Sequence, residues 1–170
     1  MMLHGLPPLV DGNTRLLILG SFPGLKSLQL QQYYAHPQNQ FWKLVFTALL
    51  EDKLGDNQRG ICARSYEKRS IKLLQLGIGL WDVYAACERE GSLDSAIRNA
   101  QVNDFAALKA CCPQLAAIAH NGGESYKHAK QGLAWGLPVH KLPSSSPANA
   151  SWSFTRKLDV WGTVLSSIKK

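Results

Sequence analysis

The sequence lacks the features that define several large classes of proteins. It contains no run of about 18 apolar residues, so no membrane-spanning helix is expected. The first residues, MMLHGLPPLVDGNTR, lack a basic segment followed by an apolar one, so no secretory signal is expected. Only 18% of the residues are charged whereas 45% are hydrophobic, which excludes a disordered chain. We therefore expect a folded, cytoplasmic protein.

Metal-binding signatures are also missing. The four cysteines form no C-x-x-C pair, and no histidine stands beside them at ligand spacing. A zinc or iron–sulfur site is therefore not expected. Without an export signal, the thiols are expected to be reduced, as in a cytosolic protein. They are Cys62, Cys87, Cys111 and Cys112.

The length of the chain suits one domain with its own core. It has 170 residues and shows no internal repeat or linker, so residues 1–170 are interpreted as a single domain. Nineteen Lys and Arg against twelve Asp and Glu give a net charge of +7. This charge suits a polyanionic partner such as nucleic acid, although basic domains without such a partner exist. Basic residues gather in residues 59–72, where a solvated helix face is the alternative explanation.

Four short apolar runs, each next to turn-forming residues, are typical of strands buried on both faces. They cover residues 14–19, 78–83, 115–119 and 138–142. Other stretches have the composition or spacing of helices. They cover residues 41–50, 104–112, 124–131 and 153–168, and residues 71–76 are expected to be the end of a further helix that Gly77 stops. Gly132 is expected to end the helix at residues 124–131. Strands that alternate with helices predict a layered α/β domain around a mainly parallel sheet.

Polar segments rich in Gly, Ser and Pro follow three of the predicted strands. They are residues 20–24, 121–124 and 143–149. In α/β folds of this kind, ligands bind outside the carboxyl ends of the strands. We therefore expect the three segments to form one binding site.

The first of these segments, GSFPG, runs from Gly20 to Gly24. Its two glycines let the backbone turn sharply and approach a ligand closely. Pro23 fixes one φ angle and removes a hydrogen-bond donor. An ordinary strand-to-helix turn has the same composition, so this segment alone identifies no ligand.

A second candidate segment, QYYAHPQNQFWKL at residues 32–44, combines aromatic rings with a polar amide. This combination suits a flat heteroaromatic base, because a ring stacks on the face of the base and an amide reads its edge or holds a water. Each side chain also has a structural explanation. These explanations are core packing for the Phe-Trp pair, loop anchoring for Tyr33 and Tyr34, a turn at His36 and a helix N-cap at Asn39.

A third candidate segment, KLPSSSPANASWSF at residues 141–154, carries three consecutive serines between prolines. Its hydroxyls and backbone N–H groups suit the oxygens of a phosphate. A serine hydrolase is not indicated, because the sequence has no G-x-S-x-G motif. A loop that caps the last helix is the structural alternative.

Together these segments resemble the uracil-DNA glycosylase superfamily, and within it the hypoxanthine-DNA (deoxyinosine) glycosylase family. The matching stretches are LILGSFPGLKSL, QYYAHPQNQFWKL, GIGLWDVYAACEREGSLDSAI and LPSSSPANASWSF. AHPQNQFW together with LPSSSPA is the specific part of the match. The resemblance implies a three-layer α/β/α fold with a four-stranded, mainly parallel sheet and a base pocket at the strand ends.

The resemblance also implies roles for individual residues. It implies that Asn39 is the principal catalytic residue and that Ser144 assists the departing base. Tyr34 would stack on the flipped base. The rest of the base pocket would be formed by Gly20, Ser21, Phe22, Pro23, Gly24, His36 and Asp82, and DNA would be contacted by Ser145, Ser146, Pro147 and Asn149. A helix-capping role is the alternative for Asp82.

The sequence departs from the superfamily pattern at three positions. Phe22 stands where the superfamily usually has an Asp or Asn that orients the attacking water. Ser144 stands where a His or Asn usually stabilises charge on the departing base. Ala148 falls near the position of a hydrophobic wedge, so Asn149 or Trp152 would have to fill the gap in the base stack.

The function implied by the resemblance is that of a monofunctional DNA glycosylase. The enzyme would flip out hypoxanthine from deoxyinosine and hydrolyse its N-glycosidic bond, which leaves an abasic site. No metal or organic cofactor and no partner chain is expected, and the substrate would be damaged double-stranded DNA, with single strands as a further candidate. The alternatives are a uracil or thymine mismatch glycosylase of the same fold, a non-catalytic binder of damaged DNA, and a nucleotide-binding α/β module.

Overall fold

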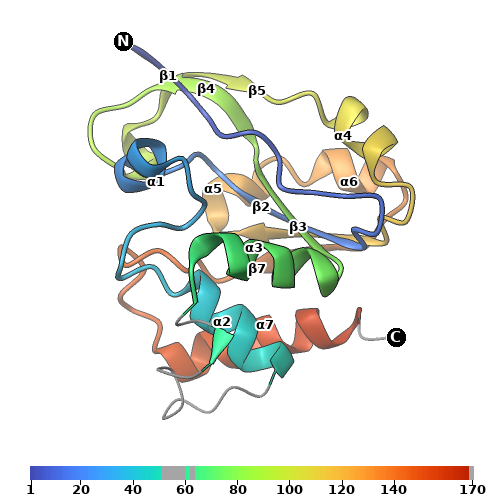
Figure 1. Cartoon of the computed structure of the whole chain (residues 1–170). Helices are drawn as coiled ribbons and strands as arrows, with labels where there is room; N and C mark the ends of the chain where they lie inside the picture. The colour runs from blue at the N-terminus through green and yellow to red at the C-terminus, as the bar shows by residue number, and fades with distance from the viewer. Residues whose placement is uncertain (51–59, 62–63, 169–170) are drawn as a thin grey trace.

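The four predicted strands form one parallel sheet with the order β3-β2-β6-β7. A computed structural model describes residues 1–50, 60–61 and 64–168 and shows helices on both faces of this sheet (Figure 1). The strands are β2 (Leu16–Gly20), β3 (Ile78–Asp82), β6 (Ala117–Asn121) and β7 (Val139–Leu142). The predicted three-layer α/β/α architecture with a four-stranded sheet is therefore confirmed.

Alternation along the central strands divides the apolar core into two halves. Leu16 and Ile18 of β2 pack with the first half, whereas Leu17 and Leu19 pack with the second. The first half contains α2 (Phe41–Leu50), α3 (Tyr66–Gln75) and α7 (Phe154–Ser166), and the second contains α4 (Phe105–Cys111). Because every residue of β2 is buried, the strand reads as the continuous apolar run expected for the centre of a parallel sheet.

The strand limits differ from the prediction by one or two residues, most at β2 and β6. The first strand begins at Leu16, because the Thr14 hydroxyl accepts a hydrogen bond from the Asp11 N–H and completes a turn. The third strand extends to Asn121, since parallel pairing with β7 continues to Leu142. This extension places the Asn121 side chain at the carboxyl edge of the sheet, where the prediction had a turn.

A second, three-stranded antiparallel sheet was not predicted. It has the order β1-β4-β5 and consists of β1 (Met2–His4), β4 (Tyr84–Glu88) and β5 (Arg98–Val102). Only Val83 separates β4 from β3, and every residue of β5 is exposed. Neither strand therefore carries an independent apolar pattern in the sequence. A short 3₁₀ helix, η3 (Asp94–Ala96), lies between β4 and β5.

The helices agree with the prediction in most places. The predicted limits of α2 are those observed, and the Ser153 hydroxyl caps the start of α7 by accepting from the Arg156 N–H. Helix α1 (Leu25–Leu30) was not predicted. None of the helices in the described part of the chain is long and apolar enough to cross a membrane.

The single helix predicted for residues 124–131 is wrong. The region forms two short helices, α5 (Gly123–Tyr126) and α6 (Lys130–Ala134). Gly132 lies inside α6 and does not end it. A Cβ at this position would come within 2.8 Å of side-chain atoms of Ile118 and Val139. This glycine therefore permits α6 to pack closely on the sheet.

Candidate active site at the carboxyl ends of the strands

A cavity of about 830 Å³ opens at the carboxyl ends of the parallel strands. All of the predicted site residues line it, together with residues 92–95, which were not predicted. The predicted ones are Gly20, Ser21, Phe22, Pro23, Gly24, Tyr34, His36, Asn39, Asp82, Ser144, Ser145, Ser146, Pro147 and Asn149. The volume lies within the range of about 300–1,000 Å³ that is typical of small-molecule sites.

The GSFPG segment forms one wall of the cavity and is fixed by its backbone. The Val83 N–H donates to the Gly20 carbonyl at 2.8 Å, and the Tyr84 N–H donates to the Ser21 carbonyl at 3.0 Å. Phe22 is only 6% exposed and lies under the guanidinium of Arg89, whose carbon is 5.2 Å from the ring centroid. Phe22 thus fills apolar space and offers no group that could orient a water.

The Asn39 side chain divides its hydrogen-bonding capacity between two tasks. Its Oδ1 accepts from the Phe41 N–H at 2.9 Å, which fixes the start of α2. Its Nδ2 donates to no residue that the structure describes, while Asn39 itself lines the cavity. The helix-start role and a role in the cavity were expected to compete for this side chain, but its oxygen serves the first and its amide N–H group is free for the second.

The two neighbouring tyrosines have different surroundings. The Tyr33 hydroxyl donates to the Pro7 carbonyl at 2.7 Å, so Tyr33 anchors the loop. Tyr34 has a left-handed backbone with φ of 54° and stacks on Phe41, with ring centroids 4.1 Å apart. Non-glycine residues in this conformation are uncommon and cluster at functional sites. Both tyrosines line the cavity, but only the Tyr34 hydroxyl makes no hydrogen bond within the described residues.

Ser145 occupies a structural position in the serine loop. It is 0% exposed, its hydroxyl accepts from Asn121 Nδ2 at 2.9 Å, and its N–H donates to Asn121 Oδ1 at 3.0 Å. Its carbonyl accepts from the Gln40 N–H, which ties the loop to the start of α2. A buried hydroxyl held by Asn121 does not fit the predicted DNA contact, and we reassign Ser145 to support of the loop.

The remaining residues of the loop are better placed to meet a ligand. Ser144 Oγ accepts from the Ser146 N–H, and Ser146 Oγ accepts from the Ala148 N–H. Each hydroxyl keeps its own O–H to donate. Pro147 is exposed, and Asn149 Nδ2 donates to the Ser144 carbonyl. The loop is thus pre-shaped with two serine hydroxyls beside the cavity.

His36 lies at the rim and shapes a turn. It is exposed, and its Nδ1 accepts from the Gln38 N–H at 3.1 Å. This contact agrees with the turn-forming alternative, although the residue also lines the cavity.

Asp82 is the last residue of β3 and caps no helix. It is 5% exposed, and its Oδ2 makes no hydrogen bond within the described residues. Burial, and to a smaller extent Asp94, raise the pKa of Asp82 to about 7, whereas Arg89 opposes the rise. A carboxyl with such a pKa in a cleft is a common feature of functional sites.

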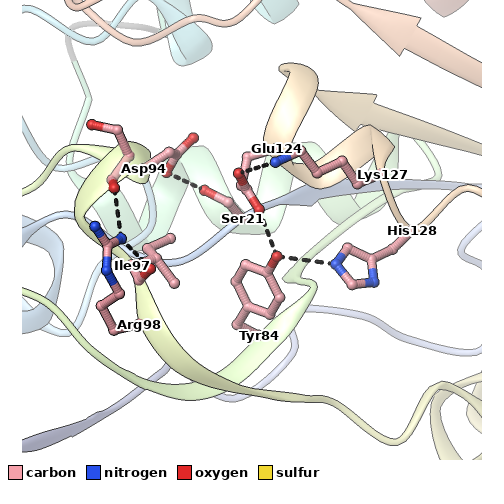
Figure 2. A network of polar contacts seen from close by, with 9 residues as sticks. Ser21, Tyr84, Asp94, Ile97, Arg98, Glu124, Lys127 and His128 are labelled. Atoms are coloured by element: carbon pink, nitrogen blue, oxygen red, sulfur yellow. Dashed lines mark hydrogen bonds and ion pairs between the residues drawn. The ribbon is translucent and has the colours of Figure 1, made fainter.

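A cluster of paired polar groups includes Ser21 of the GSFPG segment and Asp94, which both line the cavity (Figure 2). The Ser21 hydroxyl donates to Asp94 Oδ1 at 2.6 Å, and the Tyr84 hydroxyl donates to Glu124 Oε2 at 2.6 Å. His128 Nε2 lies 3.0 Å from the Tyr84 oxygen. The cluster also includes Lys127, which pairs with Glu124 at 2.9 Å. We call these six residues the paired cluster.

Three functional candidates were missed at the level of individual residues. Asp94 and Asn121 line the cavity, and both lie inside segments that the sequence had singled out, GSLDSAI and the turn after the third strand. Lys141 also lines the cavity and adds positive charge there. No spacing rule separates these three from their neighbours, because long-range pairing places them.

The basic residues of the sequence have different surroundings. Lys157 is 2% exposed, and its Nζ donates to Gln40 Oε1, so it does not belong to a basic surface. Arg156 stacks on Trp152 at 3.9 Å, and Trp152 lines the cavity. Arg59 lies outside the described residues.

Comparison with known proteins gives one consistent match. A sequence model described as the uracil DNA glycosylase superfamily matches residues 7–164. A protein of Methanosarcina acetivorans named hypoxanthine DNA glycosylase is 40% identical over 164 residues, which is 96% of this chain and 98% of that protein. A protein of the same name from Methanosarcina barkeri is 39% identical and covers 92% of this chain and 94% of its own length.

A solved structure is also similar to this chain. It is a solution NMR structure from Methanosarcina acetivorans, provisionally described as a uracil DNA glycosylase. Its TM-score is 0.85, its sequence identity is 38%, and the match covers 100% of both chains.

Proposed function

The chain belongs to the uracil DNA glycosylase superfamily, and from this membership we propose that it removes hypoxanthine from deoxyinosine in DNA. The names of the two relatives support this substrate. The observation that carries the proposal is that Phe22 and Asn39 line the same cavity. Phe22 offers no polar group to orient a water, whereas the free amide N–H group of Asn39 belongs to the same cavity.

The chemistry needs groups that stabilise separating charges. As the bond between C1′ and N9 breaks, the electron pair stays on the purine and positive charge develops on the deoxyribose. Water then adds to C1′ and loses a proton, which leaves an abasic site. A fixed N–H donor such as Asn39 Nδ2 stabilises the negative charge on the base or holds the water, at no cost of reorganisation.

Access to this bond requires that the nucleotide leaves the duplex. Extrusion costs a few kcal/mol, and a deaminated base costs less because it pairs poorly. The stacked rings of Tyr34 and Phe41 provide a rigid aromatic wall beside the cavity. We assign Tyr34 to the contact with the extruded base.

The serine loop provides the contact with the DNA backbone in this proposal. Ser144 and Ser146 offer hydroxyl donors, and Lys26 and Lys141 lie at the same cavity. Neutral hydroxyls and cations position phosphates without reading sequence. The net charge of +7 supports binding to DNA.

A second candidate function is a damaged-DNA binder without catalysis. It is favoured by Phe22 and Ser144, which replace polar groups that the superfamily usually carries. Asn39 argues against this function, because its side chain still lines the cavity and its amide N–H group is free to act there.

A lesion panel tests both candidates. Binding and base release are measured on the same oligonucleotides, which contain deoxyinosine, deoxyuridine, deoxyxanthosine or a G·T pair, in duplex and single-stranded form. We expect the fastest release from the deoxyinosine duplex. Tight binding without release of any base would establish the binder, and preferential release of uracil or thymine would establish the mismatch glycosylase.

A further inference from the structure

Two polar groups at the floor of the cavity make no hydrogen bond within the described residues. They are Oδ2 of Asp82 and the hydroxyl of Tyr34, and both atoms are buried; the Asn121 side chain lies near the Tyr34 hydroxyl but outside hydrogen-bonding geometry. Buried polar groups of native proteins nearly always have partners, so each exception needs an explanation. Both side chains line the cavity, so a bound ligand is the partner that the fold itself does not supply. We call Asp82 and Tyr34 the open pair.

Gly20 places the open pair at one spot. It stands opposite Asp82 in the register of β2 and β3. A Cβ on Gly20 would lie 2.5 Å from Asp82 Oδ1 and 3.2 Å from the Tyr34 hydroxyl. The missing side chain therefore provides the space that both polar groups share, and any other residue here would force the Asp82 carboxyl to move.

The surroundings of Asp82 favour its neutral form. Burial is the largest cause of its raised pKa, and Asp94 of η3 adds to it. Arg89, which follows β4, opposes the rise. Tyr33 and Tyr34 face the carboxyl from the loop before α2, and burial raises the pKa of both phenols. Near neutral pH, Asp82 can therefore give up a proton, whereas the two phenols cannot.

We propose that Asp82 is the general acid of the reaction and transfers its proton to the departing purine. The inference rests on the proposed function. The bond between C1′ and N9 breaks with its electron pair on the base, and the Asp82 proton goes to an acceptor of that base. Water adds to C1′, and the proton that it loses restores the Asp82 acid directly or through solvent.

This assignment explains how the chain works without the polar residue that Phe22 replaces. A neutral acid stabilises the leaving base, whereas an ionised carboxylate at the same spot would repel its negative charge. Hypoxanthine presents N7 and O6 as acceptors to such an acid. The Tyr34 hydroxyl, beside the same glycine, offers a second neutral donor to the base.

The test is a pH profile of single-turnover release from a deoxyinosine duplex. Wild type and Asp82→Asn are compared, with Asp159→Asn of the exposed face of α7 as the control. Asparagine keeps the shape and a donor but has no proton to transfer. We expect Asp82→Asn to lose about 10²-fold in rate near pH 6, in line with general acid catalysis. The wild-type rate should fall as the pH rises through about 7, and the variant should show no such fall.

The outcomes separate this inference from the proposed function. If wild type releases no hypoxanthine at any pH, the proposed function fails. If wild type is active and Asp82→Asn keeps both its rate and its pH profile, the general-acid role is wrong. A fall in rate on the acidic side that Asp82→Asn abolishes would also overturn it, because it would show a base. Thermal unfolding and duplex binding of each variant confirm that the fold is retained.

Discussion

The two polar groupings near the GSFPG segment, the paired cluster and the open pair, differ in whether their groups have hydrogen-bond partners. In the paired cluster, hydroxyls, carboxylates and cations satisfy one another, as Tyr84 does between Glu124 and His128. In the open pair, Asp82 Oδ2 and the Tyr34 hydroxyl have no partner among the described residues. Both groupings border the same glycine-rich turn, so the fold could have paired either of them.

This contrast distinguishes residues that hold the cavity wall in place from residues that take part in the reaction. A partnered network holds its backbone in place, because breaking it leaves buried groups unsatisfied. An unpartnered buried carboxyl weakens the free protein and is retained where a ligand completes it. We therefore interpret the paired cluster as the support of the cavity wall and the open pair, with Asn39, as the reacting side.

The largest expected effect comes from Asn39→Asp. Aspartate keeps an oxygen for the Phe41 N–H and suits the start of α2, so stability should hold. The variant lacks the amide N–H group, and we expect single-turnover release of hypoxanthine to fall about 10²–10³-fold.

Asn39→Ala serves as the comparison, because it removes both the oxygen and the amide. It should lose the activity and, in addition, about 1 kcal/mol of stability. Full activity in Asn39→Asp would remove Asn39 from the reacting side.

The second effect concerns stability as a function of pH. The folded pKa of Asp82, about 7, lies above its ordinary value of about 4 in the unfolded chain. Protonated Asp82 therefore stabilises the folded state fully below about pH 4, and this stability is lost as the pH rises through about 7.

Urea unfolding of wild type and Asp82→Asn at several pH values measures this difference. Between about pH 4 and pH 7, the free energy of unfolding of the variant should rise relative to that of wild type by on the order of 3 kcal/mol. A pH-independent difference between the two proteins would show that Asp82 is not held neutral.

Gly20→Ala should disrupt the open pair by crowding. The new methyl group would collide with Asp82 Oδ1 and press on the Tyr34 hydroxyl, so we expect a loss of about 1–3 kcal/mol in stability and a clear loss of release. Gly12→Ala is the matched control, since nothing lies within 4 Å of its Cβ. Equal behaviour of the two variants in unfolding and release assays would contradict the close packing at Gly20.

Tyr84→Phe tests the paired cluster. It removes the hydroxyl between Glu124 and His128 but keeps the ring, so we expect about 1–3 kcal/mol less stability. Release should change less than threefold under conditions where the variant is folded. A large loss of release with unchanged stability would place Tyr84 on the reacting side and weaken the contrast.

The smallest effect is expected from Ser146→Ala, at the backbone-binding loop. Removal of one neutral hydroxyl should weaken duplex binding about two- to tenfold. Binding of the wild type should also weaken as salt rises, because phosphate contacts release counterions. Fluorescence titration measures both, with Ser167→Ala at the end of α7 as the control.

The sequence predicted the central sheet because its strands are apolar on both faces, as at Leu16–Gly20. Every residue that the sequence assigned to the site lines the cavity, since the polar segments at the carboxyl ends of parallel strands converge. The sequence did not predict β5, whose residues are all exposed, or the break between α5 and α6. Local patterns do not contain these features.

The same limit applies within the site. The burial of Ser145 depends on Asn121, which lies 24 residues away in the chain. Likewise, the lack of a partner for Asp82 depends on packing around Gly20. No motif distinguishes Ser145 from Ser144 and Ser146. Only the tertiary structure shows that Ser145 is buried and supports the loop, whereas the other two hydroxyls lie beside the cavity.

The most direct measurement is the detection of free base after wild-type protein is mixed in excess with a deoxyinosine duplex, with Asn39→Asp in parallel. We predict free hypoxanthine and an abasic strand in equal amounts from wild type, and at most about a hundredth of that initial rate from the variant. Stable binding of the duplex with no hypoxanthine released would contradict the assignment of this cavity as a glycosylase site.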